Sequence, residues 1–234
     1  MVKLWSNDVR YYGFGFDVGT ATTSLGWTLA VAPLDVTALG DSGERTIGGI
    51  RQDNMEWGGI FDDSLSADAA ASANLGSGTN NVIQIHVGTA AGGIGYASTA
   101  LMLHHKMVAS KSELVASQAE FRVDGKWYRG QSLLIRTTFT GSGSSGTADG
   151  SALSTGTSAL FVQVFSFSGA GSGTISLQSA ATATGTYTSL ITLTAATATK
   201  SYIVTATGSL DRFTRVIKTA TGTLDMAAIV VRNV

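Results

Sequence analysis

Apolar and polar side chains alternate over short stretches through most of the chain, which is the pattern of half-buried β-strands. In Asp53–Phe61, Met55 and Trp57 fall on one face, and Asn54 and Glu56 fall on the other. Similar alternation, or enrichment in β-branched and aromatic residues, predicts further strands over Trp27–Val36, Asn81–Gly88, Glu113–Val123, Gln131–Thr140, Ala159–Phe167, Gly173–Gln178, Tyr187–Leu193, Ser201–Thr207, Phe213–Thr219 and Leu224–Val231. Many short strands separated by Gly, Ser and Thr indicate an all-β, antiparallel sandwich or barrel with little helix.

Proline and glycine indicate where these strands turn, break or lie at an edge. Pro33 has no N–H to donate, so Trp27–Val36 is expected to be an edge strand or to break there. Asp124-Gly125 stands between two alternating runs and predicts a β-hairpin. The repeated tetrapeptide Thr-Ala-Thr-Gly predicts three turns or strand ends, at Thr182–Gly185, Thr205–Gly208 and Thr219–Gly222.

A change in composition divides the chain. Residues 142–158 are dominated by Gly, Ser and Thr and predict a loop or linker. They follow a first β domain, residues 1–141, and precede residues 159–234, which form either a second β domain or the second half of the same sandwich. The Ala-rich stretch Ser64–Asn74 is a candidate short helix or surface excursion.

Charge is sparse. Charged residues make up 13% of the 234 residues and the net charge is −1, whereas typical domains are about 25% charged. This near-neutral balance argues against tight binding of phosphate or nucleic acid. So few charged side chains are expected of a subunit whose surface is covered by neighbouring subunits. They are equally expected of an unassembled β protein with a neutral surface. The sequence contains no cysteine, so neither disulfides nor thiolate metal sites hold the fold.

The sequence holds no arrangement typical of a catalytic or metal centre. His104 and His105 are adjacent, so they face opposite sides of a strand. His86 lies in an apolar strand, where a hydrogen-bonded structural role is expected. A GxGxxG match at Gly141–Gly146 is not followed by the helix that a dinucleotide site requires. We therefore expect no catalysis, no metal and no cofactor.

Aromatic residues crowd the N-terminal region. Tyr12, Phe14 and Phe16 share one face at strand spacing, which suits either core packing or an exposed carbohydrate-binding platform, and core packing is favoured. No apolar run approaches the roughly 20 residues of a membrane helix, and Met1–Asp8 lacks the apolar core of a signal peptide. We expect no export by a cleaved N-terminal signal and no membrane partner.

Short segments in a fixed order along the chain carry a family resemblance. They are Leu34–Arg45, Ile47–Gln52, Met55–Asp62, Glu113–Gly125 with Trp127–Leu134, Thr147–Gly156, Gly173–Leu193 and Arg212–Val216. Each is degenerate, but their series resembles the tail tube proteins, or major tail proteins, of long-tailed bacteriophages. Phe213, where that family usually has tyrosine, and the longer Ser64–Gly78 segment depart from the pattern.

The resemblance implies a β-sandwich subunit of the phage tail tube type, with or without a second C-terminal sandwich. Such subunits form rings, expected to be hexameric, that stack into a tube through which genomic DNA passes without specific binding. The implied partners are further copies of the chain and the tape measure, terminator and distal tail proteins. The implied location is the virion tail, after assembly in the host cytoplasm. The alternatives are a capsid decoration or other virion structural protein, and a carbohydrate-binding β module.

Two groups of residues are candidates for a role in such a tube. The first is a Gly-rich charged loop, expected to order against the next ring, although an ordinary flexible hairpin loop has the same composition: Gly40, Asp41, Ser42, Gly43, Glu44 and Arg45. The second is the acidic set Glu56, Glu113 and Glu120, which lie on expected strands. Each glutamate suits the lumen, and each equally suits a ring contact or the outer surface.

Overall fold

The computed structural model describes residues 9–19, 22–38, 42–60, 75–76, 81–109, 115–168, 173–196, 200–219 and 222–234. These residues form seventeen strands and no α-helix, and all the strand pairings are antiparallel, which confirms the predicted fold class. The candidate helix Ser64–Asn74 lies outside the described residues. The strands are β1 (Val9–Gly13), β2 (Phe16–Asp17), β3 (Thr22–Thr28), β4 (Val31–Asp35), β5 (Thr46–Arg51), β6 (Asn54–Ile60), β7 (Val82–Val87), β8 (Ile94–Val108), β9 (Ala116–Thr140), β10 (Gly143–Ser144), β11 (Ala148–Asp149), β12 (Ser154–Ser168), β13 (Gly173–Ala180), β14 (Thr188–Ala196), β15 (Lys200–Leu210), β16 (Phe213–Thr219) and β17 (Thr223–Arg232).

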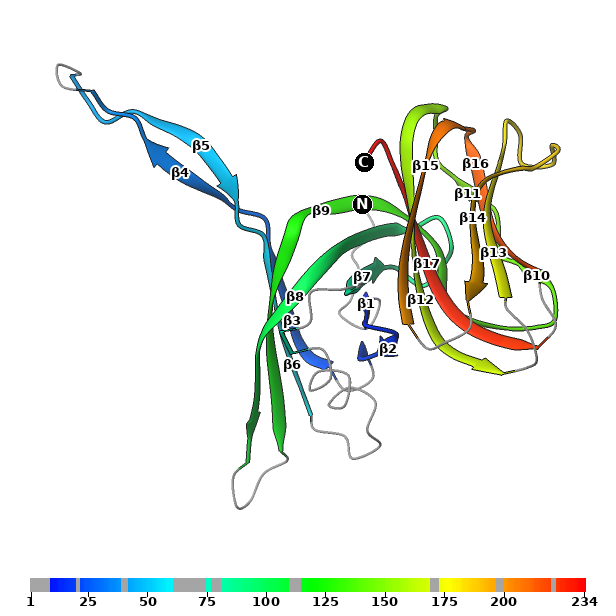
Figure 1. Ribbon diagram of the computed structural model, residues 1–234, viewed down its shortest axis with the longest axis horizontal. Coiled ribbons are helices and arrows are strands. Elements are labelled where there is room, and N and C mark those ends of the chain that lie inside the picture. Colours follow the sequence, from blue (N-terminus) through cyan, green and yellow to red (C-terminus); the bar gives the residue numbers. More distant parts are fainter. Residues whose placement is uncertain are drawn as a thin grey trace.

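One large sheet runs through the whole molecule. Its main order is β15-β12-β17-β9-β8-β7-β1-β2, and β6 and then β3 extend from the first part of β9. The 25-residue strand β9 pairs with β6 and β8 along its first part and with β17 along its second part. Figure 1 shows β8 and β9 curving across from one side of the molecule to the other.

The two predicted halves of the chain therefore share a sheet. Residues 142–158 carry β10, β11 and the start of β12 between them. A boundary between units at this segment stays a prediction.

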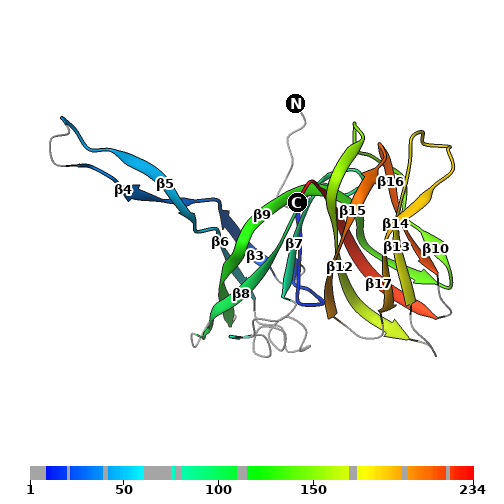
Figure 2. The ribbon, with the colours of Figure 1, turned by 45° about the horizontal axis from the view of Figure 1, so that its top comes forward.

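The C-terminal region is a sandwich. A second sheet, β10-β16-β13-β14 with β11 beside β16, packs against β15, β12, β17 and the end of β9 (Figure 2). Its core includes Leu160 and Val162 of β12, Ile175 and Leu177 of β13, and Val216 of β16, all fully buried. β12 and β17 are covered on both faces. The second sheet covers one face, and on the other face Phe161 and Ile229 join a cluster with Val82 of β7 and Ala97 of β8.

Along β6 and the first part of β9, the N-terminal region buries one face of its sheet and leaves the other open. Tyr11, Phe14, Met55, Trp57 and Phe121 join one apolar cluster there. Tyr12 is also buried, so the core interpretation of the N-terminal aromatic residues is confirmed. The shared strand face ends at Phe14, which has a φ of 57° in the turn between β1 and β2.

A two-stranded arm, β4 and β5, projects away from the body (Figures 1 and 2). The predicted strand Trp27–Val36 breaks between β3 and β4, at Leu29 and Ala30, and not at Pro33. Pro33 lies opposite Gly48 within β4. Within the described residues β4 pairs with β5 alone, so the edge position expected of a proline-containing strand is confirmed.

Two of the predicted turns are wrong. β9 continues through Asp124-Gly125, where it advances four residues, Asp124 to Tyr128, while β8 advances two, Ala97 to Thr99. The glycine, with a φ of 90°, therefore lies in a bulge and not in a hairpin. Thr205–Gly208 lies inside β15, because β12 pairs with it without interruption.

The third repeat behaves as predicted, because Thr182–Gly185 is a turn closed by the Gly185 N–H on the Thr182 carbonyl at 3.0 Å. Thr219 and Gly222 flank the connection from β16 to β17, and residues 220–221 between them lie outside the described residues.

His86 is a buried structural histidine, as predicted. Its Nε2 lies 3.0 Å from the Gln84 Oε1, and its Nδ1 lies 2.6 Å from the Ser132 Oγ. Since a carbonyl oxygen only accepts, Nε2 carries the proton and Nδ1 accepts the serine hydroxyl. Burial lowers the pKa of His86 from 6.5 to about 3, so the ring stays neutral in the folded protein.

Candidate assembly surfaces

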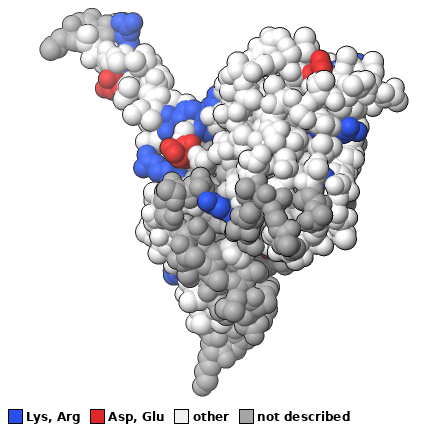
Figure 3. Space-filling model, turned by 45° about the vertical axis from the view of Figure 1, so that its right-hand side comes forward, with Lys and Arg blue, Asp and Glu red and all other residues white. Residues whose placement is uncertain are grey.

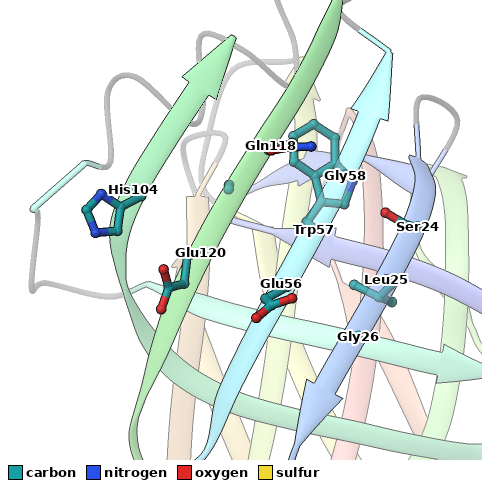
Figure 4. Close-up of a pocket in the computed structure, with 10 residues that line it drawn as sticks. Ser24, Leu25, Gly26, Glu56, Trp57, Gly58, His104, Gln118 and Glu120 are labelled. Carbon is teal, nitrogen blue, oxygen red and sulfur yellow. The ribbon is translucent and has the colours of Figure 1, made fainter. Parts of the chain in front are cut away.

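The open face of the N-terminal sheet presents aligned rows of side chains across β3, β6, β9 and β8. In one row Gly26 pairs with Glu56, Glu56 with Glu120, and Glu120 with His104. Figure 4 shows Glu56 and Glu120 on neighbouring strands, both on the side that lines an open depression. Sequence reasoning named both glutamates but had no means of placing them opposite each other.

The acidic pair lies between basic neighbours. One row away, Arg122 of β9 pairs with Asn54 and Leu101. In the row on the other side, Gln118 pairs with Gly58 and Lys106. Like charges directly opposite each other destabilise a sheet, and Arg122 and Lys106 reduce that repulsion. Glu113, the third acidic candidate, lies outside the described residues.

The outer strands of this four-stranded group, β3 and β8, each have an edge that the described residues leave largely without a partner. Within the described residues, β3 pairs only with β6. On its other side, the main chain of β8 bonds to Asn81 through Ala100 and to the Leu75–Gly76 segment through Met102, and from Leu103 to Val108 the described residues pair it with β9 alone. β3 contains no charged residue and no proline, the usual features that prevent pairing with another chain.

The direction of these edge strands is fixed by topology. β3 is antiparallel to β6, β6 to β9, and β9 to β8. β3 and β8 therefore run in opposite directions. If β8 of one copy lay beside β3 of a second copy, the antiparallel alternation would continue without a break.

The arm exposes apolar side chains to solvent. The exposed fractions are 51% for Val31, 50% for Leu34, 53% for Ile47 and 77% for Ile50. Four large aliphatic side chains on a two-stranded projection are more than scattered surface residues, and such a concentration marks an interaction surface. The sequence places Val31 and Leu34 in a stretch predicted to be an edge strand or to break at Pro33. Pro33 together with the nearby Gly-rich loop was the available signal for a projecting hairpin.

The loop candidates lie at the end of the arm. Ser42, Gly43, Glu44 and Arg45 are exposed, whereas Gly40 and Asp41 lie outside the described residues. Just below this tip, the Val36 N–H donates to the Arg45 carbonyl at 2.9 Å, and the Arg45 N–H donates to the Thr37 Oγ1 at 2.8 Å. Hydrogen bonds from Thr37 lower the pKa of the Asp35 carboxyl group. The arm is thus a continuous hairpin up to its described tip.

Few of the described residues carry charged side chains, and Figure 3 shows a face whose described residues are mostly uncharged. Among these residues no group of three or more His, Cys, Asp or Glu side chains is placed to hold a metal ion. The part of the chain that the structure describes also has no helix of the length and apolarity needed to cross a membrane. Trp57 and Trp127 are buried, so neither contributes to an exposed aromatic platform.

No protein-family model and no curated protein sequence matches the chain. Solved structures do match. The SPP1 tail tube is 12% identical with a TM-score of 0.45, over 54% of this chain and 78% of that chain. The tail of an empty gene transfer agent particle with C6 symmetry is 13% identical with a TM-score of 0.44, over 54% and 97%.

A component of the phage p2 baseplate is 8% identical with a TM-score of 0.34, over 93% of this chain and 97% of that chain. The first two are tail structures. At these identities, and with TM-scores below 0.5, the likenesses do not establish the function of this chain.

Proposed function

We propose that this chain is a structural, non-catalytic subunit of a bacteriophage tail tube. Copies assemble into rings, and the rings stack around a lumen that conducts DNA. The observation that carries the proposal is the four-stranded sheet β3–β6–β9–β8, whose two outer strands run in opposite directions and whose outer edges, β3 and the end of β8, lack a strand partner among the described residues. The ordered series of sequence segments that resembles tail tube proteins supports it independently.

The edges explain how a ring forms. When β8 of each copy pairs with β3 of the next, the contact is head-to-tail, and it closes into a ring if the rotation between copies closes. Closure leaves no free sheet edge, which removes the hazard of pairing with unrelated chains. A ring of six such copies is expected from the resemblance.

The open face is proposed to line the lumen. It then presents Glu56 and Glu120 to the DNA, flanked by Arg122 and Lys106. A lining with both signs of charge and no basic excess allows DNA to pass without being held by its phosphates.

The arm is proposed to reach an adjacent ring, where its apolar side chains become buried. Burial of apolar area is worth about 25 cal/mol per Å², so this contact favours stacking. The proposed location is the virion tail, and the further partners are the tape measure, terminator and distal tail proteins.

Cross-linking tests the ring contact directly, because the chain has no cysteine of its own. Gly26 and His104 stand at opposite ends of one row, and a Cβ added at Gly26 meets no atom within 4 Å. The double variant G26C/H104C, treated with a short bismaleimide, should give a ladder of covalent oligomers that ends in a closed ring.

The single variants G26C and H104C are matched controls and should give no ladder. Efficient dimers from either single variant would indicate two-fold pairing of like edges, and would contradict the head-to-tail ring.

Electron microscopy of the purified protein at rising concentration tests the tube. Hollow filaments with a regular axial repeat are expected. Discrete trimers would instead favour the decoration protein. Deleting residues 41–45 should leave a folded subunit that forms no tubes, because the stacking loop is lost. Normal tubes from that deletion would exclude a stacking role for the loop.

A further inference from the structure

The arm is joined to the body around one buried carboxylate. Asp53, between β5 and β6, has an exposed fraction of 1%. Its Oδ1 accepts the Ala30 N–H at 3.0 Å, and its Oδ2 accepts the Arg51 guanidinium at 2.7 Å. Oδ2 also accepts the Trp127 N–H of β9 at 3.0 Å. The carboxylate therefore holds both chain segments at the foot of the arm and binds them to the central strand of the body.

Main-chain bonds complete this joint. The Val123 N–H of β9 donates to the Asp53 carbonyl at 3.0 Å, and the Gln52 N–H donates to the Ala30 carbonyl at 2.9 Å. The bulge at Gly125 leaves Trp127 without a partner in the β8 register, so its N–H is directed to Asp53 instead. The feature that the sequence presents as a hairpin turn thus supplies a donor to the joint.

We propose that Asp53 is the positioning residue that fixes the direction of the β4–β5 arm relative to the body. The register of β3 with β6 continues into the arm, from Thr28 opposite Asn54 to Val31 opposite Arg51, but only these two chain segments cross the joint. The side chain and the carbonyl of Asp53 bind this two-stranded foot to β9. Three donors converge on the two carboxylate oxygens, and one of them is a charged guanidinium. An amide at this position keeps one accepting oxygen and presents N–H groups to the remaining donors.

The protonation behaviour of Asp53 agrees with this geometry. Burial alone would raise the pKa of its carboxyl group, but the hydrogen bonds from Trp127, Arg51 and Ala30 outweigh burial and lower the pKa below 3.8. The charged form is therefore the one that the joint holds at neutral pH.

The orienting role rests on these contacts alone, whereas its consequence for assembly rests on the proposed function. An arm of fixed direction presents its apolar side chains in one place for an adjacent ring. An arm without a fixed direction loses conformational freedom when it binds the adjacent ring, and this entropy cost weakens association.

Distances between two spin labels test the inference in the free subunit. Labels at S42C near the arm tip and T205C on β15, both exposed positions, should give one narrow distance distribution. D53N and D53A should each broaden it at least twofold. D124N is the matched control, since it removes the same charge from an exposed residue of the nearby bulge, and it should leave the width unchanged.

An unchanged width in D53N and D53A would overturn the inference. If those variants fail to fold, R51M removes only the arm's guanidinium, whose residue is partly exposed, and should broaden the distribution by a smaller amount. An unchanged width in R51M would then overturn it.

Tube formation separates this inference from the proposed function. If D53N broadens the distance distribution but the parent protein never forms tubes, the proposed tube function is contradicted and the orienting role of Asp53 stands. If the parent protein forms tubes but D53N keeps a narrow distance distribution, the tube function stands and the orienting role of Asp53 is contradicted.

Discussion

The C-terminal sandwich and the arm use the same kinds of residue in opposite ways. β17 is buried from Leu224 to Val231 because β9 and β12 flank it and layers cover it. β4 and β5 carry Val31, Leu34, Ile47 and Ile50 on a hairpin that the rest of the described chain leaves uncovered. Apolar composition alone does not distinguish a surface completed within the chain from one completed by a neighbour. The second layer makes the difference.

This contrast assigns different tasks to the two regions. The free energy of the sandwich core stabilises the isolated subunit. The apolar surface of the arm adds little to that stability, and under the proposed function an adjacent ring covers it. Substitutions in the two regions should therefore separate folding from assembly.

The largest expected effect lies in the buried region. Phe161 of β12 is fully buried on the face of the large sheet opposite the second sheet, and its ring centroid lies 5.9 Å from that of Tyr128. F161A should lower the free energy of unfolding by about 3–5 kcal/mol, because lost burial and an unfilled cavity add together. Denaturant unfolding followed by tryptophan fluorescence measures this. A loss below about 1 kcal/mol would mean that this layer is loosely packed, and the comparison would fail.

A pH dependence sharpens the comparison on the side of the buried body. His86 has a pKa of about 3 when folded and 6.5 otherwise, so between these values the unfolded chain binds a proton that the folded chain does not. Stability should therefore fall with decreasing pH below 6.5, by about 1.4 kcal/mol per pH unit from this group. H86Q should lack that contribution. Unfolding curves of both proteins at pH 7 and pH 5 measure the difference, and equal pH dependence would contradict a neutral buried ring.

The smallest effect on stability is expected in the arm. Ile50 is 77% exposed, so I50S should change the free energy of unfolding by less than about 0.5 kcal/mol. It should nevertheless raise the protein concentration needed for tubes. F161A should show the opposite pattern, with a large loss of stability in the free subunit. Substantial destabilisation of the free subunit by I50S would show that the arm packs on its own body.

The sequence predicted those features that depend on local pattern. Alternation placed Met55 and Trp57 inside and Glu56 outside, and the apolar surroundings of His86 indicated a structural role. Asp124-Gly125 was misread because a hairpin and a bulge both use a glycine with positive φ. Only the pairing of β9 with β8 and β17 decides between them.

The site depended on contacts between distant residues. Glu56 and Glu120 meet because β6 pairs with β9 in one particular register, and no local pattern specifies it. Asp53 gave no signal, because its donors come from Ala30, Arg51 and Trp127. Their convergence is a property of the fold.

The position of β17 has a consequence for biosynthesis. It lies between β12 and β9 in the large sheet, yet the ribosome makes it after both. The second part of β9 therefore lacks its β17 partner while the intervening strands emerge. Pairings so distant in sequence form slowly, and the waiting strand is exposed to other nascent chains. A chain arrested before Thr223 would have a gap in the middle of its sheet, so the sandwich closes only after β17 has left the ribosome.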